Sequence, residues 1–331
     1  MTASEGLPVG LVLGSALEPE RITQAAQLGE QHGFSELWFA EDYFFTGGIS
    51  GATAALAATQ RIPVGLGIVS AMVRHPSVLA MELATMSRMF PGRVLPGIGL
   101  GVPYWLGQMG LYPKSQLTAM RECITSVREL LAGEELTRDG DYFHFDQVKL
   151  THPPSEALPL SMGVIGPKML ELSGEIADGT VVSVLAAPEY VRWTRERIGA
   201  GAAKAGRDAT KHRIATFVLY AADADGKKAK ESLRDLTAFY LSAMPKSALT
   251  DVYGVDEELA TMVAGGQEQV AREMPASWLE DLVVAGTPDE CAEKIGRYLD
   301  AGSDSVVLFP ASAEGIEELV KFAAREVLPR I

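Results

Sequence analysis

Cysteine and basic residues are both scarce in this chain of 331 residues. The two cysteines, Cys123 and Cys291, lie in or near the start of expected helices, so we predict free thiols, and such sparse use is typical of a reducing compartment. Lysine and arginine total 29 against 43 acidic residues, which gives a net charge of -14. Without a basic stripe the chain lacks the groups that bind nucleic acids or anionic membranes, so neither partner is expected.

Long apolar runs, a secretion signal and clustered metal ligands are missing as well. No apolar run approaches the roughly 20 residues that a membrane-spanning helix needs. The first ten residues lack the basic and apolar regions of a signal peptide, so we expect a cytoplasmic protein. The five histidines are scattered and none lies near a cysteine, so we expect no metal site. The G-x-S-x-G and P-loop patterns do not occur either.

What the sequence does contain is a regular alternation of short apolar runs and amphipathic segments. Most runs are continuously apolar, which is typical of strands covered on both faces and indicates a parallel sheet. The expected strands are residues 9–13, 36–39, 64–70, 94–98, 160–164, 180–183, 214–221 and 305–309. About eight repeats of strand and helix predict an α/β fold, a single (β/α)8 TIM barrel over residues 1–331, with a doubly wound open sheet as the alternative.

Two segments interrupt this alternation. Residues 134–150 contain an Asp-Gly pair between strand-like runs, which predicts a small hairpin. Residues 246–282 are polar, partly helical and too long for a simple connection, so we expect an insertion at the barrel mouth before the last strand. After the second segment, Thr287 and Pro288 predict the start of a helix that ends near Gly302.

Glycines gather at the expected strand ends. The stretches GLGIVS (65–70) and GIGLG (97–101) do not satisfy the G-x-G-x-x-G dinucleotide pattern and indicate instead that a backbone or a flat ligand approaches closely. Farther along, the strand at 160–164 runs into Gly166 and Pro167, a favoured helix start. Its free N–H groups suit a phosphate, to which Lys168 could add a charge; a plain strand-to-helix turn is the other interpretation.

Two adjacent acids, Glu41 and Asp42, follow the second expected strand and precede three aromatic residues, 43–45. Enclosure by Trp38, Tyr43 and Phe44 would raise the pKa of such a carboxyl through desolvation. From the residues alone, however, both acids are expected to face water at the rim of the barrel.

Three stretches carry a resemblance to a known family: residues 74–101 (RHPSVLAMELATMSRMFPGRVLPGIGLG), 163–179 (GVIGPKMLELSGEIADG) and 284–295 (VAGTPDECAEKI). They resemble the bacterial luciferase-like superfamily, and within it the branch that uses the deazaflavin coenzyme F420, typified by methylenetetrahydromethanopterin reductase. The likeness runs from Val9 nearly to the end of the chain. It implies a (β/α)8 barrel that binds coenzyme F420, with FMN as the alternative cofactor.

The resemblance also implies positions for the site. A non-prolyl cis peptide of the third strand, with a bulge behind the cofactor ring, falls at Gly67–Ile68. Glu41 and Asp42 match an acid and a histidine of the relatives. Asp42 would then lie beside the cofactor ring, able to hydrogen-bond it or to relay a proton, so it becomes the first candidate for proton transfer and Glu41 the second. The remaining cofactor contacts implied by the family are Ser70, Gly99, Leu100 and Gly101 at the ring or its ribityl chain, and Ile165, Gly166 and Pro167 at the phosphate.

Differences from the relatives limit the classes of substrate that we expect. Pterin reductases carry a glutamate where this chain has Val12, and sugar-phosphate dehydrogenases carry a glutamate and a lysine near Val102 and Ala186, so neither substrate is expected. The mouth is instead expected to be apolar and aromatic, lined by Val102, Tyr104, Trp105, Leu106 and Leu185. Val102, Tyr104 and Trp105 are the candidates for substrate contact.

The sequence and the resemblance together predict an F420-dependent oxidoreductase that transfers a hydride to or from an uncharged or hydrophobic organic substrate. Two alternatives stay open: a two-component monooxygenase that uses reduced FMN, and a flavin-binding protein without turnover. A metal-dependent hydrolase barrel is disfavoured by the scattered histidines. The family further implies a homo-oligomer, most simply a dimer.

Overall fold

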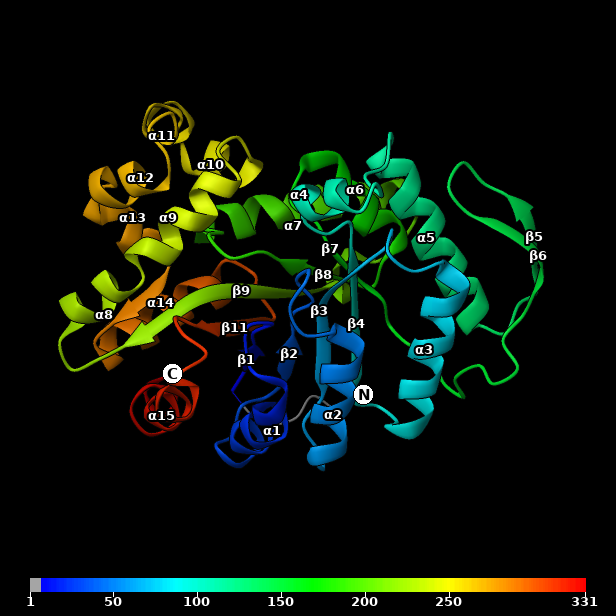
Figure 1. Cartoon of the computed structure of the whole chain (residues 1–331), viewed down its shortest axis with the longest axis horizontal. Helices are drawn as coiled ribbons and strands as arrows, with labels where there is room; N and C mark the ends of the chain where they lie inside the picture. The colour runs from blue at the N-terminus through cyan, green and yellow to red at the C-terminus, as the bar shows by residue number, and fades with distance from the viewer. Residues whose placement is uncertain (1–6) are drawn as a thin grey trace.

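Eight parallel strands close into a ring in the computed structural model, which describes residues 7–331 (Figure 1). Around the ring they are β1 (Val9–Leu13), β2 (Leu37–Phe39), β3 (Val64–Ser70), β4 (Val94–Gly99), β7 (Ser161–Gly163), β8 (Gly179–Val182), β9 (Arg213–Ala222) and β11 (Ser305–Pro310). Strand β9 pairs with both β8 and β11, and β11 pairs with β1, so the ring has no open edge. The predicted barrel is confirmed, and the open-sheet alternative is wrong.

The strand boundaries differ from the predicted ones by one residue in several places. One of these residues is Glu36, which precedes β2 and is buried at the amino end of the barrel. Its carboxylate accepts hydrogen bonds from Ser305 (2.6 Å) and Arg213 (2.5 Å). The absence of a secretion signal was inferred from the first ten residues, and residues 1–6 of these lie outside the described residues.

Helices cover the outside of the ring. They are α1 (Ile22–Gln31), α2 (Gly48–Ala58), α3 (Pro76–Met89), α5 (Gln116–Leu131), α6 (Pro167–Ile176), α7 (Pro188–Lys204), α14 (Pro288–Asp300) and α15 (Ile316–Phe322). Helix α14 begins as predicted, with a capping box in which Thr287 and Glu290 satisfy each other's backbone N–H groups. No helix within residues 7–331 is both long enough and apolar enough to cross a membrane.

Two large aromatic side chains fill the inside of the barrel. The rings of Trp38 on β2 and Phe217 on β9 meet edge to face, with centroids 5.5 Å apart. The neighbouring strand β3 makes room for them, because a Cβ on Gly65 would lie 2.3 Å from the Trp38 ring and a Cβ on Gly67 would lie 2.5 Å from Phe217. Glycines on one strand therefore compensate for bulky interior residues on its neighbours.

The two predicted interruptions are both present. The hairpin consists of antiparallel strands β5 (Leu136–Asp139) and β6 (His144–Val148) and flanks α3 and α5 (Figure 1). The helical region between β9 and the next strand begins at Gly226, earlier than the predicted residue 246, because Asp225 caps a helix directly after β9. Its helices are α8 (Gly226–Ser232), α9 (Arg234–Ala243), α10 (Ala248–Tyr253), α11 (Asp256–Val263), α12 (Gln267–Glu273) and α13 (Ala276–Asp281). We call these six helices the helical insertion.

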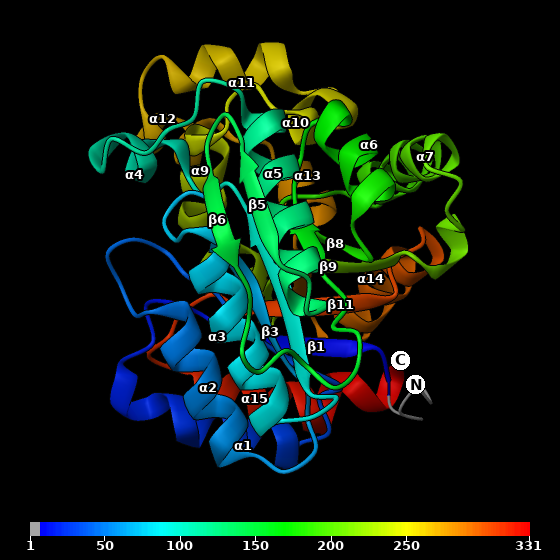
Figure 2. The same ribbon diagram turned by 90° about the vertical axis from the view of Figure 1, so that its right-hand side faces the viewer.

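Two short elements were not predicted. Strand β10 (Val284–Gly286) pairs with the carboxyl end of β9 and lies outside the ring, and three residues are too few to give a sequence pattern. Helix α4 (Pro103–Gln108) follows β4 directly. Both views place α10, α11 and α12 at the same end of the molecule as α4, which is the end where the barrel strands finish (Figures 1 and 2).

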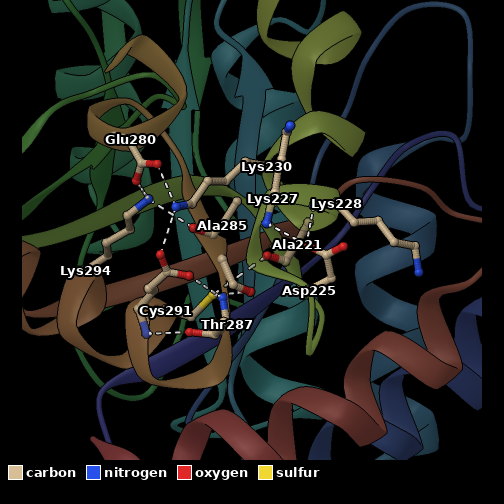
Figure 3. Close-up of polar contacts among 12 residues, drawn as sticks. Ala221, Asp225, Lys227, Lys228, Lys230, Glu280, Ala285, Thr287, Cys291 and Lys294 are labelled. Atoms are coloured by element: carbon tan, nitrogen blue, oxygen red, sulfur yellow. Dashed lines mark hydrogen bonds and ion pairs between the residues drawn. The ribbon is translucent and has the colours of Figure 1, made fainter. Parts of the chain in front are cut away.

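A charged cluster fastens the helical insertion to the barrel (Figure 3). Lys230 of α8 binds Glu280 of α13 at 2.6 Å and Glu290 of α14 at 2.8 Å. The largely buried Lys294 of α14 binds Glu280 at 3.1 Å and donates to the carbonyl oxygen of Ala285 at 3.0 Å. Hydrogen bonding by Lys230 is the main cause that lowers the pKa of Glu290 to about 2. The cluster therefore joins the first and last helices of the insertion to each other and to β10.

Candidate active site

The segments that follow the barrel strands carry the candidate site residues. Because the strands are parallel, their carboxyl ends meet at one face of the barrel, which is where barrels of this kind place their active sites. Ser15 follows β1, Glu41 and Asp42 follow β2, and Gly101 follows β4. Gly166 follows β7 and starts α6.

Glu41 is held by four donors. Arg74 binds it through both guanidinium branches, at 2.6 Å to Oε1 and 2.7 Å to Oε2. The backbone N–H of Gly48 donates to Oε1 and the hydroxyl of Tyr43 donates to Oε2, each at 3.1 Å. Since the side chain is buried and both oxygens are occupied, this geometry favours a structural carboxylate.

Asp42 has a different environment. It is half-buried, and the hydroxyl of Ser15 donates to its Oδ2 at 2.5 Å. Burial raises the pKa of Asp42, the Ser15 hydrogen bond opposes that rise, and the charge of Glu41 adds to it. The predicted direction of the shift agrees with this result, but Phe44 takes no part in enclosing the carboxyl because it is 69% exposed.

The middle of β3 has the geometry that the resemblance implies. The Gly67–Ile68 peptide is cis, as predicted, and the pairing of β3 with β4 shifts register between Leu66 and Val69. The Ile68 side chain lies against two glycines, since a Cβ on Gly99 would be 3.0 Å from it and a Cβ on Gly163 would be 2.5 Å from it. A second non-prolyl cis peptide, Tyr43–Phe44, was not predicted.

Ser70 links the ends of β3 and β4. Its hydroxyl donates to the carbonyl oxygen of Leu100 at 2.5 Å and accepts from the N–H of Met72 at 3.1 Å. Gly101 has φ +93°, a conformation that L side chains rarely adopt, and a Cβ there would approach Ser70 within 3.4 Å. These contacts bring Ser70, Leu100 and Gly101 together, as the family pattern implies.

The start of α6 is open. The first helical hydrogen bond runs from the N–H of Leu170 to the carbonyl of Gly166 at 2.9 Å, so the N–H groups of Lys168 and Met169 precede it and have no partner in the helix. A Cβ on Gly166 would meet nothing within 4 Å. The hydroxyl of Tyr190 fixes the preceding carbonyl of Ile165 at 2.5 Å. This open helix start can accept an anion.

The charge expected from Lys168 does not point toward this helix start. Lys168 is exposed and lines a groove on the outer surface between α5 and α6, together with Arg121 and Lys204. Arg121 binds Glu175 at 2.7 Å and Lys204 binds Glu171 at 2.5 Å, so the groove carries charges of both signs. Within residues 7–331 no group of histidine, cysteine or acidic side chains is arranged to hold a metal ion.

Aromatic rings from two loops meet at the rim. Trp105 of α4 lies edge to face with Tyr43 at 6.3 Å and with Phe45 at 6.5 Å, measured between ring centroids. Tyr104 and Val102 are exposed beside it. The predicted apolar mouth is therefore present in part.

Other residues expected at the mouth are buried. Leu106 and Leu185 are packed inside the protein, and so are Val12 and Ala186, the positions at which relatives carry charged groups. Val12 belongs to the same interior cluster as Trp38, so its side chain is not at the mouth.

Three residues of the site region gave no usable signal in the sequence: Ser15, Arg74 and Tyr240. Ser15 lies 27 positions from its partner Asp42, and Arg74 lies 33 positions from Glu41. Tyr240 comes from α9 of the helical insertion and is near enough for the charge of Asp42 to affect it.

Comparison with known proteins identifies the family. The family model of luciferase-like monooxygenases matches residues 7–305. The chain belongs to this family. The resemblance inferred from the three sequence stretches is therefore confirmed for nearly the whole length of the protein.

Within the luciferase-like family, the chain is similar to a methanopterin reductase and to two proteins whose names include coenzyme F420. It is 29% identical over 314 residues to the 5,10-methylenetetrahydromethanopterin reductase of Methanolobus tindarius, covering 93% of this chain and 95% of the relative. It is 28% identical over 327 residues to the F420-dependent glucose-6-phosphate dehydrogenase of Nakamurella multipartita, covering 95% and 93%. The solved structure of the coenzyme F420-dependent tetrahydromethanopterin reductase from Methanopyrus kandleri matches with a TM-score of 0.85 at 25% identity, covering 98% and 99%.

Proposed function

We propose that this member of the luciferase-like family is an F420-dependent oxidoreductase acting on an uncharged or hydrophobic organic substrate. The observation that carries the proposal is similarity, over more than nine-tenths of the chain, to a glucose-6-phosphate dehydrogenase and a tetrahydromethanopterin reductase that both have coenzyme F420 in their names. When bound, the deazaflavin would donate or accept a hydride at C5 of its ring. The protein's part is to hold the two reactants face to face and to exclude water.

The residues present fit such a coenzyme. Ile68, supported by Gly99 and Gly163, offers an apolar platform in the carboxyl-terminal half of β3 for a flat ring. The open start of α6 at Gly166 offers unpaired N–H groups and a positive helix end for a phosphate. Both features lie at the carboxyl ends of strands that are neighbours in the ring, β3–β4 and β4–β7.

Two acids then have separate roles. Asp42 is our candidate for proton transfer, because its carboxyl is only half-buried and its pKa is raised toward neutrality by burial. Glu41 is assigned to positioning the loop after β2, because its oxygens are already bonded to Arg74, Gly48 and Tyr43. Exposed Val102 and Tyr104, with Trp105, make the rim that we expect to contact an apolar substrate.

The first experiment is a binding titration of the purified protein with coenzyme F420 and with FMN, each oxidised and reduced. Clear preference for F420 supports the proposal, whereas preference for reduced FMN would replace it with the monooxygenase alternative. A Gly166→Leu variant should bind F420 at least about tenfold more weakly, because the new side chain fills the open space at the start of α6. The matched control is Gly199→Leu, which adds the same side chain at another open position, on α7.

A substrate screen follows the coenzyme's absorbance. Neutral organic compounds should support turnover and charged phosphate esters should not, and the opposite result would refute the assignment of the rim. An Asp42→Asn variant should keep coenzyme affinity and lose about 100-fold or more in turnover. Full turnover in that variant would refute the role of Asp42. We further propose a cytoplasmic homodimer, which sedimentation analysis and cell fractionation would test.

A further inference from the structure

Ser15 and Asp42 form a side-chain pair across the carboxyl ends of two adjacent strands. Strands β1 and β2 are paired in register up to Leu13 and Phe39, and the chain reaches Ser15 and Asp42 two and three residues later. Ser15 is only 6% exposed, and its hydroxyl donates to Oδ2 of Asp42 at 2.5 Å. This distance is typical of a hydrogen bond to an ionised carboxylate.

The pair leaves the Asp42 carboxyl asymmetric. Oδ2 accepts the hydroxyl of Ser15, whereas Oδ1 accepts no hydrogen bond from any side chain or backbone group within residues 7–331. The adjacent Glu41 differs in this respect, since each of its oxygens accepts two donors. Both oxygens of Glu41 are thus hydrogen-bonded within the protein, whereas Asp42 keeps one oxygen available to a ligand.

The charged and titratable groups around Asp42 are few. Glu41 is negative but is paired with Arg74, which limits its effect on its neighbour. From the helical insertion, Tyr240 of α9 is affected by the charge of the same carboxyl; burial and the charge of Asp42 raise the pKa of Tyr240 to about 12, so its phenol stays protonated. Ser15 is therefore the group that donates a hydrogen bond directly to the side chain of Asp42.

We propose that Ser15 is a positioning residue, which fixes Oδ2 of Asp42 and aims Oδ1 at the proton that leaves or joins the substrate during hydride transfer. In the oxidative direction the bond between that proton and a substrate heteroatom breaks, and a bond from the proton to Oδ1 forms. When bound, the oxidised deazaflavin would accept the hydride, which carries the electron pair of the broken C–H bond. The reverse direction returns the same proton. This inference rests on the proposed function, and its test is chosen to separate the two.

Ser15 also adjusts when Asp42 holds a proton. A hydrogen bond donated to the ionised form stabilises that form, so it counteracts the effect of burial. Removing the hydroxyl should therefore raise the pKa of Asp42 by about one unit. A serine that only filled space would have no such effect.

The test follows the Asp42 carboxyl in the full chain without coenzyme or substrate, by carbon-13 NMR of protein labelled at the aspartate γ-carboxyl. The Asp42→Asn variant assigns the signal. Ser15→Ala should shift the titration upward by about one pH unit, while Ser15→Thr, which keeps the hydroxyl, should titrate like the wild type. Ser15→Cys, a weaker donor of similar size, should shift the titration in the same direction by less, and it serves if the alanine variant fails to fold.

A titration unchanged or lowered in both Ser15→Ala and Ser15→Cys would overturn the inference, whatever the coenzyme proves to be. If F420 binds, the pH profile of kcat/KM should move upward in Ser15→Ala with little change in coenzyme affinity. Loss of affinity with an unmoved profile would mean that Ser15 serves binding alone and would also overturn it. Failure of F420 to bind would refute the proposed function, and the NMR result would then decide the inference about Ser15.

Discussion

The ion pair between Arg74 and Glu41 supports the loop that follows β2, and replacing Arg74 by methionine should destabilise the fold. Methionine keeps an apolar stem in place of the arginine side chain, so the change removes mainly the charge and its hydrogen bonds. The Glu41 side chain is only 3% exposed, and Arg74→Met would leave it with two neutral donors, Gly48 and Tyr43. A buried carboxylate that loses its charged partner is the costly case.

The magnitude follows from the geometry. Breaking a buried ion pair by removing one partner typically costs about 3–5 kcal/mol. Arg74 is 22% exposed and also lies 3.5 Å from Glu82, so it keeps some water and a second acid, and we expect the lower end, about 3 kcal/mol. In the double variant Glu41→Gln/Arg74→Met no buried charge is left without a partner. About half of the lost free energy of unfolding should therefore be recovered.

Urea unfolding at pH 7, followed by far-UV circular dichroism, measures these free energies. The matched control is Arg121→Met, because Arg121 also binds its partner Glu175 through both branches, at 2.7 and 2.8 Å, but 47% of its side chain is exposed. That change should cost less than about 1 kcal/mol. Equal effects at the two sites, or additive losses in the double variant, would refute the view that burial of Glu41 makes the pair important.

Other predictions concern the barrel itself. Gly65→Ala should cost about 3 kcal/mol, because the added Cβ would lie 2.3 Å from the Trp38 ring, whereas Gly199→Ala in open space should not destabilise; equal unfolding midpoints would contradict this. Burial lowers the pKa of His212 to about 4. The unfolded chain, with an ordinary pKa of about 6.5, therefore takes up the proton first, and stability is lost as pH falls from about 6.5 toward 4. Between pH 7 and 4.5, His212→Gln should reduce the loss in free energy of unfolding by about 2–3 kcal/mol. An unchanged loss in this variant would argue against the role of His212.

The barrel could be predicted from the sequence because its strands are buried on both faces. Runs such as 9–13 and 64–69 are apolar throughout, as a sheet covered on both faces requires. The start of α14 was equally accessible, since Thr287, Pro288 and Glu290 form a local pattern with a local cause. By contrast, β10 has three residues and is defined by its pairing with β9, which no local pattern records.

For the candidate site, the sequence could predict which residues to consider but not the role of each. The sequence and the family resemblance identified Glu41 and Asp42, but two adjacent acids cannot be told apart without their partners. Those partners, Arg74 and Ser15, come from other loops and reach the acids only when the ring closes. The pKa of a carboxyl depends on such contacts, so the difference between a structural and a reactive acid arises at the level of tertiary structure.

The cluster of Lys230, Glu280 and Glu290 has a consequence for how this scaffold can diversify. It brings the entry and exit of the helical insertion side by side, although they are about 50 residues apart in the chain. The cost of closing a loop rises only slowly with its length, so the segment between two joined ends can grow, shrink or be replaced while the barrel stays unchanged. The insertion carries Tyr240, whose pKa the charge of Asp42 affects, so a change in this segment would alter the surroundings of Asp42 while the barrel strands stay the same.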